Sequence, residues 1–568
     1  MSKHDLVIRG GTIVDGSGGD AFTGDIAIDG DRITKVGTVD NRGNREVDAG
    51  GALVTPGFVD VHTHYDGQAT WAERMSPSSN HGVTTVVMGN CGVGFAPVRK
   101  QDHQRLVELM EGVEDIPGAA LHEGLTWEWE TFGDYLDYLD RRSYDMDVAA
   151  QLPHGPVRLY VMGERGANRA AATPDDIAEM RKIAAAAASA GAIGFTTSRT
   201  LNHRSSKGEP TPSLNASREE LTGIAMGLRD AGTGVLQLIT DFDDVDEEFD
   251  NFEHMMQSSG RPLSLSLAQG LGGGWRKILG RIEYANSRGM SVRAQVAPRP
   301  IGVLLGLTAT MNPLSAHPGF AAIKDESLES KVNRLRDPAF RAQLLGEQPL
   351  PVFERLKRLI GNFDRIWELG DVPNYEPDRE QSIGAIARRE GRAPLEVAYD
   401  ALLKNDGRAM LYTPFANYAD FNLDAAREMM MHKDTIMGLG DGGAHVGTIC
   451  DASFTTTLLT HWARDRGRDQ IPLPLLVKSQ TLDTANAVGL RDRGVLAPGK
   501  RADLNVIDFD NLRARAPEIV HDLPAGGARL QQRADGYLHT VVRGKVTYSG
   551  GEPTSALPGR LVRGAQEA

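Results

Sequence analysis

The alternation of apolar and polar positions along the chain predicts a core of alternating strands and helices. The segments between the apolar runs are amphipathic, and the clearest helix, 173–191, opens on Thr-Pro and two acids and ends on glycine. The apolar runs themselves have the length of buried strands, and they lie at 57–64, 83–89, 147–152, 192–198, 234–240, 262–268, 290–296 and 435–441. Strands separated by helices in this way predict an α/β fold, a (β/α)8 TIM-like barrel around a parallel sheet.

A doubly wound sheet is the alternative architecture for such a pattern. Its usual mark is a glycine-rich loop that follows the first strand and opens a helix. The only comparable stretch near the N-terminus, GSGGDAF at 16–22, opens no helix. The barrel is therefore the favoured interpretation.

The two ends of the chain have a different character from the middle. Residues 1–56 and 490–560 read as short alternating strands with glycine turns, which predicts one small β-sandwich domain built from both termini. The barrel then occupies 57–489. Within it, 300–380 breaks the strand-helix rhythm and is expected to be a helical insertion before the last barrel strand.

Composition narrows the class of protein. The chain has 568 residues, of which 40% are apolar, and a net charge of −14, so a large core is expected and binding to nucleic acid or anionic membrane is not. No apolar run approaches the roughly 20 residues of a membrane span. With two cysteines and no signal-peptide pattern, we expect a cytoplasmic protein whose partner is a small molecule, and the pattern leaves a homo-oligomer open.

The first barrel strand carries the sharpest chemical motif, PGFVDVHTHYD at 56–66. Because side chains alternate along a strand, His62 and His64 point to the same side. Active sites of such barrels lie at the carboxyl ends of the strands, and zinc accepts imidazole nitrogen. We therefore predict that both histidines ligate a metal ion.

Two further residues follow strands at the same face. Asp441, in MGLGDGGAHVG, closes the last predicted strand, where it could ligate the metal and exchange a proton with water. Cys91, in VVMGNCGVGFAP, follows the second strand, and its thiolate is a candidate ligand or nucleophile.

These motifs together resemble the amidohydrolase superfamily, and its N-acyl-D-amino-acid deacylase (D-aminoacylase) branch in particular. The opening VIRGGTIVDGSG, the stretch GVTTVVMGNCG and the terminal GVLAPGKRADLNVID are similar to that branch, and the likeness covers nearly the whole chain. It implies a metal-dependent barrel in which Cys91 is a zinc ligand, Asp441 is the aspartate after the last strand, and His445 is its companion.

The chain also departs from the branch, whose members carry metal-binding histidines on strands five and six. Here these strands read GVLQLITDF and LSLSLAQG, with Gln237 in a plausible ligand position and Gln269 after strand six. Amides are poorer zinc ligands than imidazole. One zinc ion is therefore expected rather than two.

Arg199 and His203 follow strand four, at the predicted catalytic face. An arginine there can bind a carboxylate through two hydrogen bonds. With His445 and Gln237, these residues form the predicted substrate-binding set.

The favoured hypothesis is a hydrolase that cleaves a C–N amide bond, most simply of an N-acyl (D-)amino acid. Metal-bound hydroxide would attack the carbonyl, and Asp441 would act as general base and then as general acid. Two alternatives stay open: a cyclic amidase of the hydantoin or dihydropyrimidine kind, and a non-catalytic binding protein on a decayed barrel.

Overall fold

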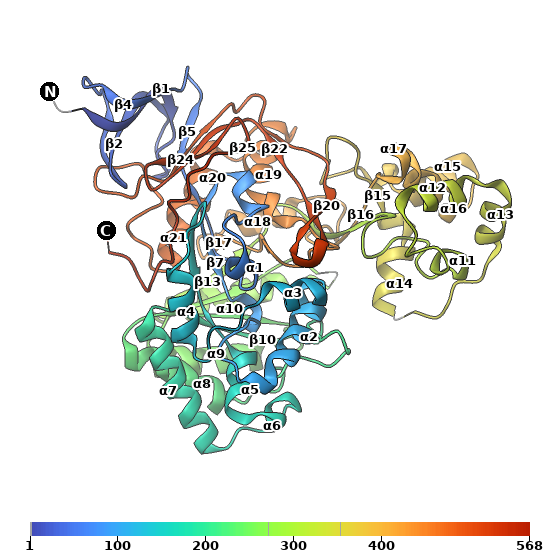
Figure 1. The fold of residues 1–568 in the computed structure, drawn as a ribbon, viewed down its shortest axis with the longest axis horizontal. Helices are drawn as coiled ribbons and strands as arrows, with labels where there is room; N and C mark the ends of the chain where they lie inside the picture. The colour runs from blue at the N-terminus through green and yellow to red at the C-terminus, as the bar shows by residue number, and fades with distance from the viewer. Residues whose placement is uncertain (1–2, 271, 353, 568) are drawn as a thin grey trace.

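The computed structural model describes residues 3–270, 272–352 and 354–567 (Figure 1). Each of the predicted core strands is present, usually a little shorter than its apolar run. They are β6 (Phe58–Asp60), β7 (Val83–Met88), β8 (Asp147–Ala150), β10 (Gly194–Arg199), β11 (Val235–Thr240), β12 (Leu263–Ser266), β13 (Val292–Val296) and β17 (Thr435–Met437). The predicted α/β fold is confirmed.

These strands form two parallel sheets. One has the order β6-β7-β8, and the other has the order β17-β13-β12-β11-β10-β9, in which β9 (Leu152–Pro153) follows β8 after a single residue. Backbone hydrogen bonds also run between the segments just after β6 and β17: Asp441 N–H donates to His62 O over 3.0 Å, and His64 N–H donates to Gly442 O over 2.7 Å. The two segments that carry the predicted ligands therefore lie side by side.

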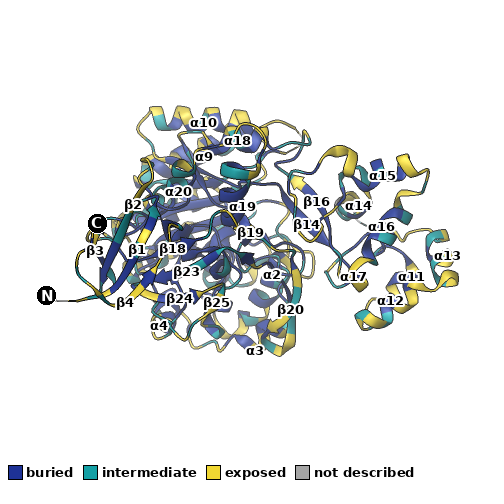
Figure 2. Cartoon of the chain, turned by 90° about the horizontal axis from the view of Figure 1, so that it is seen from above, coloured by how far each residue is buried: buried dark blue, intermediate teal, exposed yellow. Residues whose placement is uncertain are grey.

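Helices cover the outward side of the parallel strands, and Figure 2 shows their outer faces as exposed and the strands between them as buried. The predicted helix at 173–191 is α7 (Pro174–Ala190), in which Thr173 and Asp176 form a capping box and Gly191 ends the helix at a φ of 116°. Other helices of this layer are α2 (His103–Glu114), α4 (Phe132–Asp140), α5 (His154–Met162), α8 (Arg218–Ala231), α9 (Val245–Ser259), α10 (Trp275–Ser287), α18 (Asp424–Met430), α20 (Leu473–Gln480) and α21 (Leu482–Ala487).

A separate nine-stranded sheet combines strands from both ends of the chain. Its order is β25-β24-β23-β18-β5-β1-β2-β3, with β4 paired to β1. Figure 1 shows its N-terminal and C-terminal strands next to one another, away from α7 and α8. The strands are β1 (His4–Ile13), β2 (Phe22–Asp29), β3 (Arg32–Gly37), β4 (Gly43–Asp48), β5 (Leu53–Pro56), β18 (Leu504–Ile507), β23 (Tyr537–Val542), β24 (Lys545–Ser549) and β25 (Glu552–Pro553).

Residues 301–416 form a lobe that projects to one side (Figure 1). It leaves and rejoins the rest of the chain through β14 (Ile301–Leu305) and β16 (Leu411–Ala416), which pair antiparallel with each other, and β15 (Trp367–Glu368) pairs with β16. The lobe has its own apolar cluster, which includes Leu335 and Leu402. It extends beyond the predicted insertion at 300–380, because the helices that follow 380 pack into the same core. Its helices are α11 (Pro318–Ala321), α12 (Leu328–Arg336), α13 (Pro338–Gly346), α14 (Glu354–Gly361), α15 (Ile383–Glu390), α16 (Pro394–Leu402) and α17 (Lys404–Gly407).

None of the helices in the described part of the chain combines the length and apolarity that a membrane crossing requires.

Candidate metal centre

His62 and His64 lie directly after β6 and are almost completely buried, with exposed fractions of 1% and 2%. The Nδ1 atom of His62 lies 2.5 Å from Gln295 Oε1 on β13. The Gln295 amide is itself oriented, because its Nε2 donates to Ser264 Oγ over 2.9 Å. This contact leaves His62 Nε2 facing the interior of the site.

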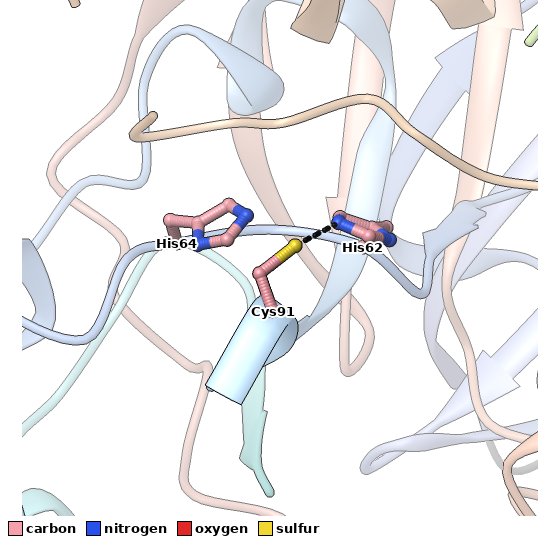
Figure 3. Close-up of side chains that lie close together, drawn as sticks. All are labelled: His62, His64 and Cys91. Atoms are coloured by element: carbon pink, nitrogen blue, oxygen red, sulfur yellow. Dashed lines mark hydrogen bonds between the residues drawn. The ribbon is translucent and has the colours of Figure 1, made fainter. Parts of the chain in front are cut away.

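Cys91 reaches the same point from the loop after β7. Its backbone has a φ of 55°, and its N–H donates to the side-chain oxygen of Gln237 on β11 over 3.3 Å. The Asn90 side chain fixes the loop by donating to the carbonyls of Thr63 and Val87. The Cys91 Sγ atom lies 3.4 Å from His62 Nε2, and Figure 3 shows the thiol between the two imidazole rings.

Asp441 completes the cluster from the loop after β17. Its Oδ1 lies 3.3 Å from His62 Nε2 and 3.7 Å from His64 Nε2. The loop can approach this closely because glycine follows: a Cβ on Gly442 would lie 2.5 Å from Ser78 Oγ. The flanking glycines of the sequence motif are thus required for placing the carboxylate.

The donor set fits a zinc-type ion. The ligand atoms of His62, His64 and Cys91 lie within 4.8 Å of one another, and the Asp441 carboxylate adds an oxygen on the same side. Two imidazoles, a thiolate and a carboxylate are ligands that zinc accepts. A second group, Glu283 with His432 and Asp434, is more exposed, and Lys433 and Arg293 already pair with its acids, so it is the weaker candidate.

Electrostatics within the cluster favour the anionic forms of the two acidic donors. Burial raises the pKa of Cys91, but the His62 charge and hydrogen bonds from both histidines outweigh burial and lower it. Burial likewise raises the pKa of Asp441, and His62 and His64 hold it well below its usual range. Burial lowers the pKa of His62, yet Cys91 and Asp441 raise it to about 9. Thiolate and carboxylate are the forms that bind metal ions.

Glu114, the last residue of α2, was not among the residues predicted from the sequence. Its side chain is 1% exposed, and its Oε1 lies 3.1 Å from His64 Nδ1. Its Oε2 lies 3.9 Å from His445 Nε2. Burial raises the pKa of Glu114, but His64, His445 and His203 outweigh burial and lower it.

The structure places the predicted substrate-binding residues in different surroundings. His203 and His445 lie close enough to Glu114 to lower the pKa of its carboxyl group. His203 Nδ1 also lies 2.9 Å from Ser198 Oγ. Burial lowers the pKa of His203 to about 4, which favours the neutral ring. Arg199 instead donates to both carboxylate oxygens of Glu248.

The two glutamines singled out on and after the fifth and sixth predicted strands also lie in different surroundings. Gln237 lies against Cys91, as described above, and its Nε2 is buried without a hydrogen-bond partner among the described residues. Gln269 lies outside the cluster: its side chain donates to Asp420 and accepts from the Ala419 N–H.

Comparison with known proteins identifies the family of this chain. Residues 45–548 match the model of the amidohydrolase family, so the chain belongs to that family. N-acyl-D-glutamate deacylase from Alcaligenes xylosoxydans xylosoxydans is 26% identical over 578 residues, which is 99% of this chain and 97% of that protein. D-aminoacylase from the same organism is 36% identical over 194 residues, which is 34% of this chain and 37% of that protein.

A solved structure shares the fold. N-acyl-D-glutamate deacylase from Bordetella bronchiseptica, complexed with zinc and a phosphonate inhibitor, aligns over 99% of this chain and 100% of that chain. The TM-score is 0.65 and the identity is 22%. The resemblance drawn from the sequence motifs is confirmed.

Proposed function

We propose that this chain is a metal-dependent hydrolase that cleaves the C–N bond of an N-acyl amino acid, with preference for the D form. The observation that carries the proposal is the convergence of His62 Nε2, His64 Nε2, Cys91 Sγ and Asp441 Oδ1 on one buried point. The relatives named D-aminoacylase and N-acyl-D-glutamate deacylase support the substrate class.

We further propose that the two parallel sheets constitute the (β/α)8 barrel at 57–489, with the residues 301–416 lobe inserted before its last strand. The strand order and the hydrogen bonds between the segments after β6 and β17 support a closed ring. The nine-stranded sheet supports a small β-domain built from 1–56 and 490–560. The free thiols of Cys91 and Cys450 support a cytoplasmic location.

In the proposed site His62, His64, Cys91 and Asp441 would hold one zinc ion. A bound zinc ion polarises a carbonyl and lowers the pKa of water to about 7. The neutral amides Gln237 and Gln295, which lie against Cys91 and His62, support a single ion rather than two.

Asp441 is the proposed proton-transfer residue. Its Oδ1 faces both histidines, and the side chain is 15% exposed, so it is the ligand candidate with the most access to substrate. As a carboxylate it can accept a proton at the start of the reaction and return it to the leaving nitrogen. His203 and His445, which both lie near Glu114, are the proposed polar contacts for the substrate. Arg199 could bind a substrate carboxylate only after its ion pair with Glu248 breaks.

The function is tested by elemental analysis of protein purified without chelator, together with assays on N-acyl-D-amino acids, N-acyl-L-amino acids and hydantoins. We expect about one zinc per chain and hydrolysis of N-acyl-D-amino acids. Substoichiometric metal with no hydrolysis across the panel would overturn the proposal in favour of a binding protein. Hydrolysis of the cyclic amides alone would place the chain with the cyclic amidases.

The role of Cys91 gives a separate prediction. Cys91→Ala removes the sulfur atom from the proposed donor set, so the variant should lose zinc to a mild chelator faster than the wild type does. Cys91→Asp restores an anionic donor and should recover part of the retention, because zinc accepts carboxylate oxygen as well. Zinc release is followed with a chromophoric chelator, and Cys450→Ala, which alters the other buried thiol, serves as control. Equal release from wild type and Cys91→Ala would exclude ligation.

A further inference from the structure

Glu114 occupies a position where a carboxylate is costly. Its side chain is buried at the C-terminal end of α2, where the helix dipole disfavours negative charge. Neither carboxylate oxygen has a well-aligned hydrogen bond among the residues that the structure describes. The nearby histidines, which lower its pKa, are what compensate the buried charge, and this points to a role within the histidine cluster.

The neighbours of Glu114 indicate what that role is. His64 Nδ1 lies 3.1 Å from Glu114 Oε1. With Nδ1 turned toward Glu114, His64 presents Nε2 to Asp441 and to the rest of the donor cluster. His62 is arranged in the same way, since its Nδ1 contacts Gln295 Oε1 and its Nε2 faces the donor cluster. Each proposed histidine ligand therefore has a side-chain oxygen next to its Nδ1, 2.5 Å away for His62 and 3.1 Å away for His64.

Glu114 is also tied to the other side of the site. Its backbone carbonyl accepts from Val446 N–H over 3.1 Å, in the loop that carries Asp441 and His445. The end of α2 thus fixes the position of the carboxylate relative to this loop as well as to His64.

We propose that Glu114 is a positioning residue of the metal centre, which accepts the Nδ1 proton of His64 and so holds the Nε2 lone pair toward the ion. The proposal rests on the proposed function, because it requires that His64 bind a metal. Outer acceptors of this kind fix the tautomer and orientation of a histidine ligand, and their removal typically lowers metal affinity about 10–100-fold.

The test is zinc affinity, measured by competition with a chromophoric chelator, for the wild type, Glu114→Gln and Glu114→Leu. Glu114→Leu removes the acceptor and should weaken zinc binding about 100-fold. Glu114→Gln keeps an oxygen but loses its charge, and should weaken binding about 10-fold. Cobalt-substituted variants should keep the thiolate-to-cobalt absorption of Cys91, because the ion stays in the same site.

A second measurement separates positioning from a structural role. The loss of zinc affinity in Glu114→Leu should persist at temperatures well below the Tm of the metal-free variant, because a positioning residue acts on the bound ion and not only on the folded state. Glu220→Gln is the matched control: Glu220 is also buried against a histidine, with its Oε1 2.9 Å from His154 Nε2, but it lies outside the donor cluster. That variant removes the carboxylate charge that pairs with Arg158 and should lower Tm while zinc affinity stays unchanged.

The outcomes are distinguishable. Wild-type zinc affinity in both Glu114 variants would overturn the positioning role and leave the proposed function intact. A lower metal-free Tm in Glu114→Leu, with affinity unchanged from wild type after refolding, would make Glu114 structural. A wild type that binds neither zinc nor cobalt would overturn the proposed function itself.

Discussion

His62→Ala and His64→Ala should each lose most of the bound metal and most of the hydrolytic activity. Each substitution removes one of the two imidazoles at the buried point where Cys91 and Asp441 also converge. Metal catalysis supplies several kcal/mol of transition-state stabilisation, so kcat/KM should fall about 10³-fold or more. Metal content by elemental analysis and kcat/KM on an N-acyl-D-amino acid measure the two effects.

His122→Ala is a suitable control, because His122 is exposed on α3 (Gly118–Gly124) and lies outside the donor cluster. It should keep wild-type metal content and rate. Full metal content and full rate in either His62→Ala or His64→Ala would show that the site is wrongly assigned.

Asp441→Asn should lose catalysis while keeping metal. The amide retains the shape of the side chain and an oxygen near His62, but it cannot accept a proton. General acid–base groups typically contribute about 10²–10⁴ in rate, so kcat should fall by that factor while His62, His64 and Cys91 retain the ion. Single-turnover kinetics and elemental analysis on the same preparation test both parts.

Two results would change the assignment of Asp441. Wild-type kcat in Asp441→Asn would exclude proton transfer by this residue. Loss of metal together with activity would make Asp441 primarily a ligand and leave the hydrolase proposal standing.

The core strands could be predicted from the sequence because each is a compact apolar run between helices of recognisable pattern. The helix at 173–191 was predictable to its caps, since Thr173, Asp176 and Gly191 act locally. The end of the lobe was not, because the segment after 380 is helical in either context. Its place depends on long-range packing of Ile383 and Val397 into the lobe core, which no local pattern records.

The candidate site also contains residues that the local sequence could predict and residues that it could not. His62 and His64 lie two residues apart in the segment that follows β6, so side-chain alternation along an extended chain predicted their common side. Glu114 and Gln295 lie far from the motifs in sequence, and only the fold brings them behind the histidines. One local sign did exist for Glu114: it lies four residues after the buried Met110, on the apolar side of α2, where an acid is out of place.

The loop after β17 is held by three segments that are remote from it in sequence. Val446 N–H donates to Glu114 O on α2, Leu304 N–H on β14 donates to Thr448 O, and Leu530 N–H on β21 (Gly527–Gln531) donates to Val446 O. To lift this loop, the protein would have to break all of these bonds together, at a cost nearer to sub-global unfolding than to fraying. The loop that carries Asp441 is therefore a poor hinge, and we expect substrate admission and product release to depend on other segments around the mouth.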